Sequence, residues 1–154
     1  MKVGIIVHSK TGNTLFVAQK IMEKLRADGH LTTIEQIIAY NDEETDIQKI
    51  ELQNIPNVSE YDVLILGAPV RAFSLSPVMK AYLTKCAPFQ GKKVNCFVTQ
   101  YFPYPWMGGN RAIRQMKNLC KSKHAKMLGS SIINWKNKKR DQMIIESVKK
   151  FSSI

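Results

Sequence analysis

Hydroxyl, amide and glycine residues gather directly after the first apolar segment of the chain. The run Ser9-Lys10-Thr11-Gly12-Asn13-Thr14 follows the apolar residues 3–7 and precedes a long amphipathic segment. A phosphate group placed there would meet the free N–H groups of a first helical turn and the positive end of the helix dipole. The alternative is a capped helix without a ligand, with Thr or Asn as N-cap. A cap needs one hydroxyl, so three hydroxyls beside a glycine favour a phosphate site.

Two further segments have the composition of a site for a flat ligand. Residues 67–75 supply apolar side chains and backbone groups, and residues 99–110 contain four aromatic rings within six positions. Such rings outside any strand or helix period are hard to explain as core, whereas aromatic faces stack well on a planar ligand. The alternatives are that Phe73 folds into the core and that Tyr104 wraps a small hydrophobic cluster.

Apolar runs and amphipathic segments alternate along the chain. Continuous apolar runs predict buried strands at 3–7, 63–66 and 94–98, and weaker patterns predict strands at 31–38 and 127–135. Spacings of three and four predict helices after Asn13, after Ser76-Pro77, after Asn110 and over 143–151. The acidic stretch 41–60 predicts a loop with one short helix.

This alternation predicts a single α/β domain over residues 1–154, with a parallel sheet and helices on both faces. Ligands of such sheets bind at the carboxyl ends of the strands. The loops 8–14, 67–75 and 99–110 follow three of the predicted strands and are therefore expected to meet at one edge.

The run Ser9-x-Thr11-Gly12-Asn13-Thr14 after a first strand resembles the phosphate loop of the flavodoxin family, and the other two loops follow in that family's order. The resemblance covers essentially the whole chain. The uninterrupted fifth predicted strand is similar to that of the short-chain flavodoxins. It implies a flavodoxin-like three-layer sandwich with a five-stranded parallel sheet in the order 2-1-3-4-5, helices on both faces, and FMN as the cofactor.

The resemblance also implies which residues contact FMN. The first loop would hold the phosphate, the second would pack on one side of the isoalloxazine ring, and the third would follow the ring edge and ribityl chain. Tyr101 and Trp106 both remain open as the stacking ring. The implied cofactor-binding residues are Ser9, Lys10, Thr11, Gly12, Asn13, Thr14, Pro69, Val70, Arg71, Ala72, Phe73, Thr99, Gln100, Tyr101, Phe102, Trp106 and Gly108.

Three functions follow from this pattern. The first, which the resemblance favours, is an electron carrier that passes electrons between redox partner proteins with acidic docking surfaces. The second is an FMN-dependent NAD(P)H:quinone-type reductase with a small quinone-like acceptor, in which Arg71 is available to an anionic group. The third, ranked lowest, is a cofactor-free basic module that binds nucleic acid.

The sequence departs from the flavodoxin pattern in two respects. The chain has a net charge of +11, and no Asp or Glu occurs from Val63 to Arg140. Without carboxylates near the flavin, its fully reduced anion is expected to be more favourable than in an acidic flavodoxin. No glycine stands between Arg71 and Leu75, so a peptide reorientation there is expected to cost more and to leave the one-electron-reduced state less stable.

Other side chains offer little chemistry. Cys86, Cys96 and Cys120 form no C-x-x-C pair and read as inert buried residues in a reducing cytoplasm. No apolar run has the length of a membrane span, so no membrane insertion is expected. His8 lies next to the first loop, so the alternatives are a contact with the cofactor and, as the favoured interpretation, a strand-end residue without a role. We expect no metal site and no catalytic side chain.

Overall fold

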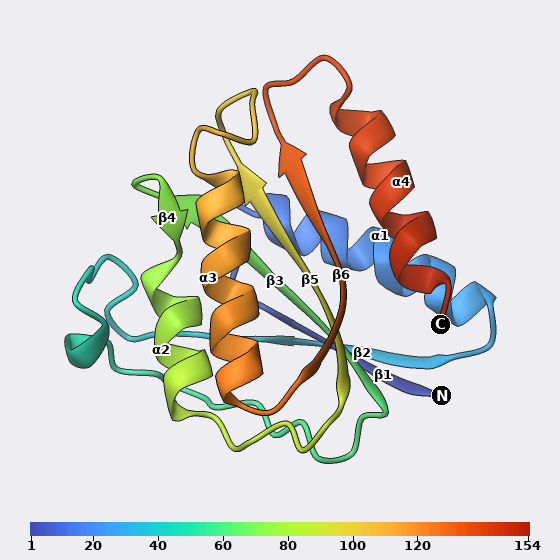
Figure 1. Ribbon diagram of the computed structural model, residues 1–154, viewed down its shortest axis with the longest axis horizontal. Helices are drawn as coiled ribbons and strands as arrows, with labels where there is room; N and C mark the ends of the chain where they lie inside the picture. Colours follow the sequence, from blue (N-terminus) through green and yellow to red (C-terminus); the bar gives the residue numbers. More distant parts are fainter.

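The computed structural model describes residues 1–154 as five parallel strands with helices on both faces (Figure 1). The strands are β1 (Lys2–Val7), β2 (Leu31–Gln36), β3 (Val63–Arg71), β5 (Lys93–Gln100) and β6 (Lys126–Asn134). They lie in the order β2-β1-β3-β5-β6, which confirms the predicted 2-1-3-4-5 order of the parallel strands. A two-residue strand, β4 (Ser74–Leu75), pairs antiparallel with the end of β3.

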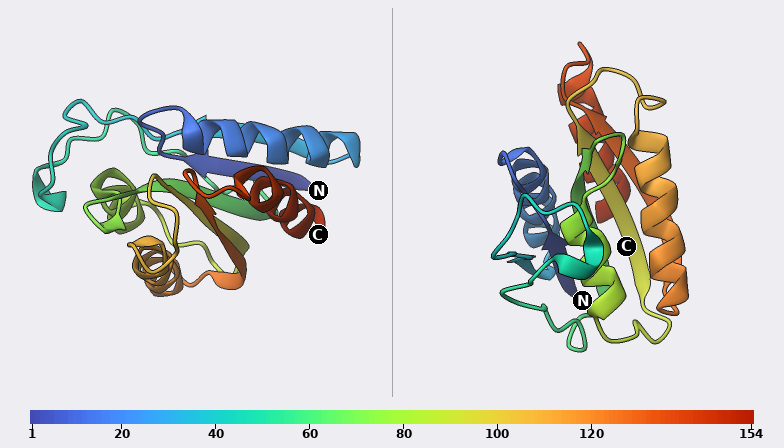
Figure 2. Two further views of the ribbon diagram at one scale, coloured as in Figure 1. Left: turned by 90° about the horizontal axis from the view of Figure 1, so that it is seen from above. Right: turned by 90° about the vertical axis from the view of Figure 1, so that its left-hand side faces the viewer.

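The helices form the two outer layers (Figure 2). The helices α1 (Asn13–Ala27) and α4 (Arg140–Ser152) cover one face of the sheet, and α2 (Pro77–Lys85) and α3 (Gly109–Ser122) cover the other. The acidic stretch forms a loop with one short 3₁₀ helix, Ile47–Lys49, as the sequence predicts. No helix is long and apolar enough to cross a membrane.

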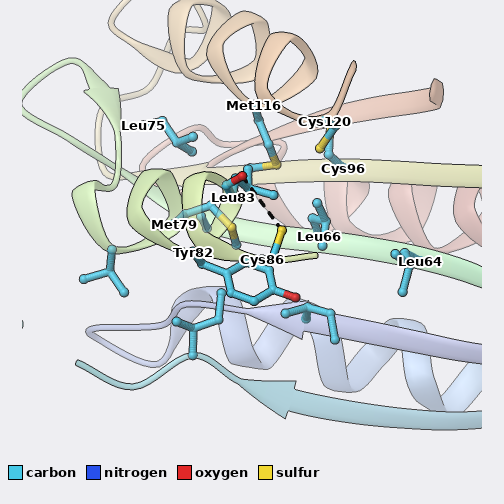
Figure 3. Close-up of a cluster of buried hydrophobic side chains, with 14 of the residues drawn as sticks. Leu64, Leu66, Leu75, Met79, Tyr82, Leu83, Cys86, Cys96, Met116 and Cys120 are labelled. Carbon is cyan, nitrogen blue, oxygen red and sulfur yellow. Dashed lines mark hydrogen bonds between the residues drawn. The ribbon is translucent and has the colours of Figure 1, made fainter. Parts of the chain in front are cut away.

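A separate hydrophobic core lies on each face of the sheet. The larger core packs α2 and α3 against the sheet and includes Leu64, Leu66, Met79, Tyr82 and Met116 (Figure 3). The smaller core packs α1 and α4 against β1, β3, β5 and β6. Burial on both faces explains why these strands read as unbroken apolar runs rather than as alternating ones.

All three cysteines are buried in the larger core, and burial raises the pKa of each thiol, that of Cys96 to about 12. The thiolate is the reactive form, so these side chains are inert at neutral pH. This confirms the interpretation of the cysteines as small buried residues.

One expectation about local structure and one of the alternatives are wrong. The segment 67–75 is not an open loop, because β3 continues to Arg71 and turns back as β4 in a tight hairpin. The alternative of a helix capped by Thr or Asn is wrong too, because the N-cap of α1 is Gly12, which has a φ of +95° and no side chain that could cap the helix. A plain capped helix therefore does not describe the start of α1.

Candidate functional site

A cavity of about 590 Å³ opens at the carboxyl edge of the sheet. Its volume lies within the range of small-molecule and cofactor sites. Its walls come from the ends of β1, β3, β5 and β6 and from the segments that follow them. The lining residues are His8, Lys10, Thr11, Asn13, Pro69, Val70, Arg71, Ser76, Thr99, Gln100, Tyr101, Trp135, Lys136 and Arg140.

The first loop presents a row of unpaired backbone donors. The N–H groups of the six residues 9–14 have no hydrogen-bond partner in the protein, and the next one, that of Leu15, donates to Ser9 Oγ at 3.2 Å. Gly12 adopts a left-handed conformation with no atom within 4 Å of where a Cβ would stand. Successive free N–H groups at a helix N-terminus are suited to a phosphate.

A buried hydrogen bond joins the first loop to the third. Thr14 Oγ1 lies 2.8 Å from Thr99 Oγ1, and both side chains are almost fully buried. The start of α1 is therefore fixed to the end of β5. The hydroxyl of Thr14 has a protein partner, so the free donors of this loop are mainly its backbone N–H groups.

The hairpin between β3 and β4 turns on Ala72 and Phe73, with φ of +49° and +60°. Two positive φ angles in a two-residue hairpin define a type I′ turn, in which glycine and asparagine are preferred. Gln115 of α3 accepts hydrogen bonds from Leu75 N at 2.8 Å and Ser74 Oγ at 3.0 Å, which ties the hairpin to the helix. Gly108 packs so closely against the Phe73 backbone that a Cβ would come within 2.7 Å of it.

The aromatic residues of the third loop lie at the surface. Tyr101 and Tyr104 are 63% and 52% exposed, and Phe73 of the hairpin is 54% exposed, so the core alternatives for Phe73 and Tyr104 are wrong. Phe73 stacks on Phe102 with ring centroids 5.6 Å apart, and Tyr104 stacks on Trp106 at 6.2 Å. Of the two candidate stacking rings, Tyr101 lines the cavity and Trp106 stands outside it.

Gln100 places an unpaired acceptor beside the cavity. Its Nε2 donates to the backbone oxygen of Tyr104 at 2.6 Å and to Asn134 Oδ1, while its Oε1 is buried without a partner. A buried unpaired acceptor is costly unless a ligand donates to it. The ring N–H and ribityl hydroxyls of a flavin are such donors, and the free N–H row at 9–14 suits its phosphate. The residues present therefore fit FMN.

His8 has a place in the site that its sequence position did not reveal. Its Nε2 lies 2.8 Å from Asp42 Oδ1, and its Nδ1 lies 2.8 Å from Ser76 Oγ. Ser76 Oγ accepts from Met79 N, so its proton points to His8 Nδ1 and the ring donates through Nε2 to Asp42. Burial lowers the pKa of His8, with the Asp42 contacts opposing that effect. The ring is thus neutral and links the acidic loop, residues 41–60, to the start of α2.

The acidic loop supplies carboxylates that the local sequence around the cavity lacks. Glu43 pairs with Lys10 at 2.5 Å and with Arg71 at 3.3 Å, and the hydrogen bond from Lys10 lowers the pKa of Glu43. Arg71 also donates to the backbone oxygens of Asp42 and Glu43. The expectation of surroundings without carboxylates is therefore wrong. These contacts join segments about 30 residues apart, so no local pattern in the sequence indicates them.

The segment after β6 forms a wall of the cavity that the sequence argument did not consider. Lys136 Nζ lies 5.0 Å from the centroid of the Tyr101 ring, and the Arg140 guanidinium lies 4.9 Å from the centroid of Trp135. Trp135 also meets Phe16 of α1 edge to face. The signal for this wall was available, because this segment too follows a parallel strand.

The predicted contact residues are brought together at one edge but not all into the cavity. Lys10, Thr11 and Asn13 line it with residues of the other two loops, namely Pro69, Val70, Arg71, Thr99, Gln100 and Tyr101. Ser9, Gly12 and Thr14 shape the first loop. Five predicted contact residues do not line the cavity, namely Ala72, Phe73, Phe102, Trp106 and Gly108.

Solved structures of flavin proteins share the fold over the whole chain. A flavodoxin from Streptococcus pneumoniae TIGR4 aligns with a TM-score of 0.68 at 14% identity, covering 99% of each chain. A WrbA-like flavodoxin from Agrobacterium tumefaciens aligns with a TM-score of 0.72 at 13% identity, covering 99% of this chain and 92% of the other. A Megasphaera elsdenii flavodoxin reaches 21% identity with a TM-score of 0.61, covering 95% and 97%. At these identities the likeness establishes the fold.

No curated protein sequence is significantly similar to the chain. A family model does match it over residues 1–139, nine-tenths of its length, and that model describes NADPH-dependent FMN reductases. The match confirms FMN as the cofactor that the first loop predicted. The chain belongs to the NADPH-dependent FMN reductase family.

Proposed function

We propose that the protein is an FMN-dependent reductase that takes two electrons from a reduced pyridine nucleotide and passes them to a small, quinone-like acceptor. The observation behind this choice is the extent of the cavity. It continues past the residues expected to hold the flavin to Trp135, Lys136 and Arg140, which gives a second ligand both space and positive charge. FMN supplies the redox chemistry, because it takes up a hydride and releases electrons singly or in pairs.

In this proposal the protein binds and orients rather than transferring protons through its own side chains. The N–H groups of residues 9–14 hold the phosphate, and Gln100 Oε1 accepts from a flavin donor. Pro69, Val70 and Tyr101 border the ring with largely apolar surface.

The type I′ turn favours two-electron chemistry. Reorienting the peptide between Ala72 and Phe73 would convert the turn to type II′, whose first central residue adopts a conformation essentially reserved for glycine. Ala72 therefore opposes the reorientation that the flavodoxin resemblance links to the one-electron-reduced state. Electrons are then expected to leave mainly in pairs.

The experiment is anaerobic mixing of the FMN-loaded protein with NADPH, followed by steady-state turnover with a neutral quinone. We expect loss of the oxidised-flavin absorbance without a build-up of one-electron-reduced flavin, and sustained NADPH oxidation once the quinone is added. Ala72→Gly should increase the one-electron-reduced fraction in a dithionite titration. Gln90→Gly is the control, because Gln90 also has a positive φ, of +53°, but does not line the cavity. It should leave the one-electron-reduced fraction unchanged.

A second candidate is the electron carrier, and the exposed aromatic surface favours it. Five rings are exposed, and Lys136 lies over one of them, that of Tyr101; the five belong to Phe73, Tyr101, Phe102, Tyr104 and Trp106. Exposed aromatic residues with neighbouring cations suit a partner protein with an acidic docking surface. Flavin that NADPH does not reduce, but that dithionite reduces in two resolved steps, would reject the reductase and support the carrier. Both candidates place the protein in the cytoplasm, a reducing compartment in which free thiols persist.

A further inference from the structure

We propose that Lys136 and Arg140 form a phosphate subsite for the pyridine-nucleotide donor, on the side of the cavity formed by the segment after β6. The inference rests on the proposed reductase function and names the part of the site that recognises the donor. The group that this subsite would bind is a phosphate. It comes either from the pyrophosphate, which NADH and NADPH both have, or from the additional 2′-phosphate of NADPH.

The two cations are held in place by aromatic rings. Lys136 Nζ stands 5.0 Å from the ring centroid of Tyr101, and the Arg140 guanidinium stands 4.9 Å from that of Trp135. Trp135 itself is held between strand and helix, since its backbone N–H donates to the Gln100 backbone oxygen at 2.8 Å and its ring contacts that of Phe16. Cation–π contacts reduce the freedom of long side chains and so lower the entropy lost when they bind an anion.

Only one exposed carboxylate opposes the two charges of this pair. Lys136 has no carboxylate partner, and Arg140 has only the neighbouring Asp141, whose Oδ1 lies 3.4 Å from Nε and whose side chain is 85% exposed. The other two cations of the cavity differ, because Lys10 and Arg71 share the carboxylate of Glu43. Of the four cations that line the cavity, Lys10 and Arg71 are thus paired with a carboxylate of the protein, whereas Lys136 and Arg140 are available to a ligand.

The phosphate of FMN does not need this pair. The six unpaired backbone N–H groups at residues 9–14 already provide donors and the positive end of a helix dipole for it. An arginine fork beside a lysine ammonium is a common arrangement for a further phosphate, since the fork binds two oxygens and the ammonium adds a point charge. A donor whose nicotinamide lies against the flavin would then have its phosphates bound by Lys136 and Arg140 in the same cavity.

The test is the double variant Lys136→Gln/Arg140→Gln in the FMN-loaded protein. Lys138→Gln/Lys139→Gln is the matched control, because it removes the same charge from the same segment at residues that do not line the cavity. We expect the cavity variant to raise the KM for the donor roughly tenfold or more, as loss of charge-assisted hydrogen bonds does. Its kcat and its affinity for FMN should stay near wild type, and the control should match wild type in all three.

Measuring the KM with both NADPH and NADH distinguishes the two sources of the phosphate. A KM effect confined to NADPH assigns the subsite to the 2′-phosphate, and an equal effect with NADH assigns it to the pyrophosphate. A rise in the dissociation constant of FMN with an unchanged donor KM would overturn the proposal, because the pair would then serve the cofactor. Equal KM effects in the cavity and control variants would also overturn it, because they would reflect general surface charge.

A binding measurement separates this proposal from the reductase function. Calorimetric titration of the FMN-loaded protein with 2′,5′-ADP and with ADP requires no turnover. If wild type binds either nucleotide and the cavity variant binds it roughly tenfold more weakly, the subsite stands even where NADPH does not reduce the flavin. If wild type oxidises NADPH but the cavity variant binds both nucleotides normally, the reductase stands and the subsite is wrong.

Discussion

At the scale of single residues, His8 shows how a buried polar group connects the site to stability. Its ring links Asp42 of the acidic loop to Ser76 at the start of α2, and its surroundings keep it neutral. It touches the cavity without having a free nitrogen for a ligand. Its role is to hold the acidic loop, and through that loop Glu43, against Lys10 and Arg71.

This role predicts how stability depends on pH. The folded pKa of His8 lies below the ordinary value of 6.5, so below pH 6.5 the unfolded chain takes up a proton that the folded chain resists. The free energy of unfolding should therefore be level above that pH and fall below it, by up to about 1.4 kcal/mol per pH unit from this group. Chemical denaturation at a series of pH values from about 5 to about 8 measures this dependence.

His8→Gln should flatten the dependence, because glutamine keeps a polar side chain that does not titrate in this range. His124→Asn is the control, since His124 is exposed and its left-handed conformation, with φ of +64°, suits asparagine. An acid-induced loss as steep in His8→Gln as in wild type would contradict the assignment to His8.

At the scale of elements, both ends of α1 use glycine in the left-handed region. Gly12 has φ of +95° at the N-terminus and Gly29 has φ of +91° beyond the C-terminus, and neither would bring a Cβ within 4 Å of another atom. The backbone penalty of an alanine should thus be similar at the two ends, about 1 kcal/mol or somewhat more. The ends differ in function, because only the first belongs to the row of free N–H groups.

Gly12→Ala and Gly29→Ala should therefore lower the unfolding free energy by comparable amounts, while only Gly12→Ala weakens FMN binding, by roughly tenfold. Thermal unfolding without FMN gives the first quantity, and quenching of flavin fluorescence gives the second. Equal FMN affinities in the two variants would show that the first loop does not hold the phosphate.

The elements themselves could largely be predicted from the sequence, and their contacts could not. The parallel strands and four helices follow from apolar period and run length, because burial on both faces leaves a local pattern. The hairpin at Ala72-Phe73 gave no such signal, since a type I′ turn without glycine or asparagine runs against turn preferences. The His8–Asp42 and Arg71–Glu43 contacts depend on the tertiary packing of a loop that has little periodic structure.

At the scale of the whole molecule, charge is distributed unevenly. The chain has a net charge of +11, and its acidic residues fall mainly in the first 62 positions, with the Asp42–Glu43 segment folded onto the cavity. A positive molecule with several cations at its site attracts anionic ligands from a distance, and dissolved salt screens this attraction.

The kcat/KM for NADPH should consequently fall as salt is added, by roughly tenfold when the Debye length shortens from about 30 Å to about 10 Å. The kcat/KM for a neutral quinone, measured at saturating NADPH, should change little over the same range. A dependence on salt that is equal for both substrates would point to an effect on the protein rather than on the encounter with the anionic donor.

The buried bond between Thr14 and Thr99 has a consequence for how fast the cofactor loads. It joins the start of α1 to the end of β5, where Thr99 lines the cavity, so the phosphate end and the ring end of the site keep a fixed spacing before any ligand arrives. A binding site that is already assembled loses little conformational entropy when the ligand binds and requires no slow ordering step. Loading of FMN should therefore proceed in a single phase whose rate rises linearly with the concentration of flavin.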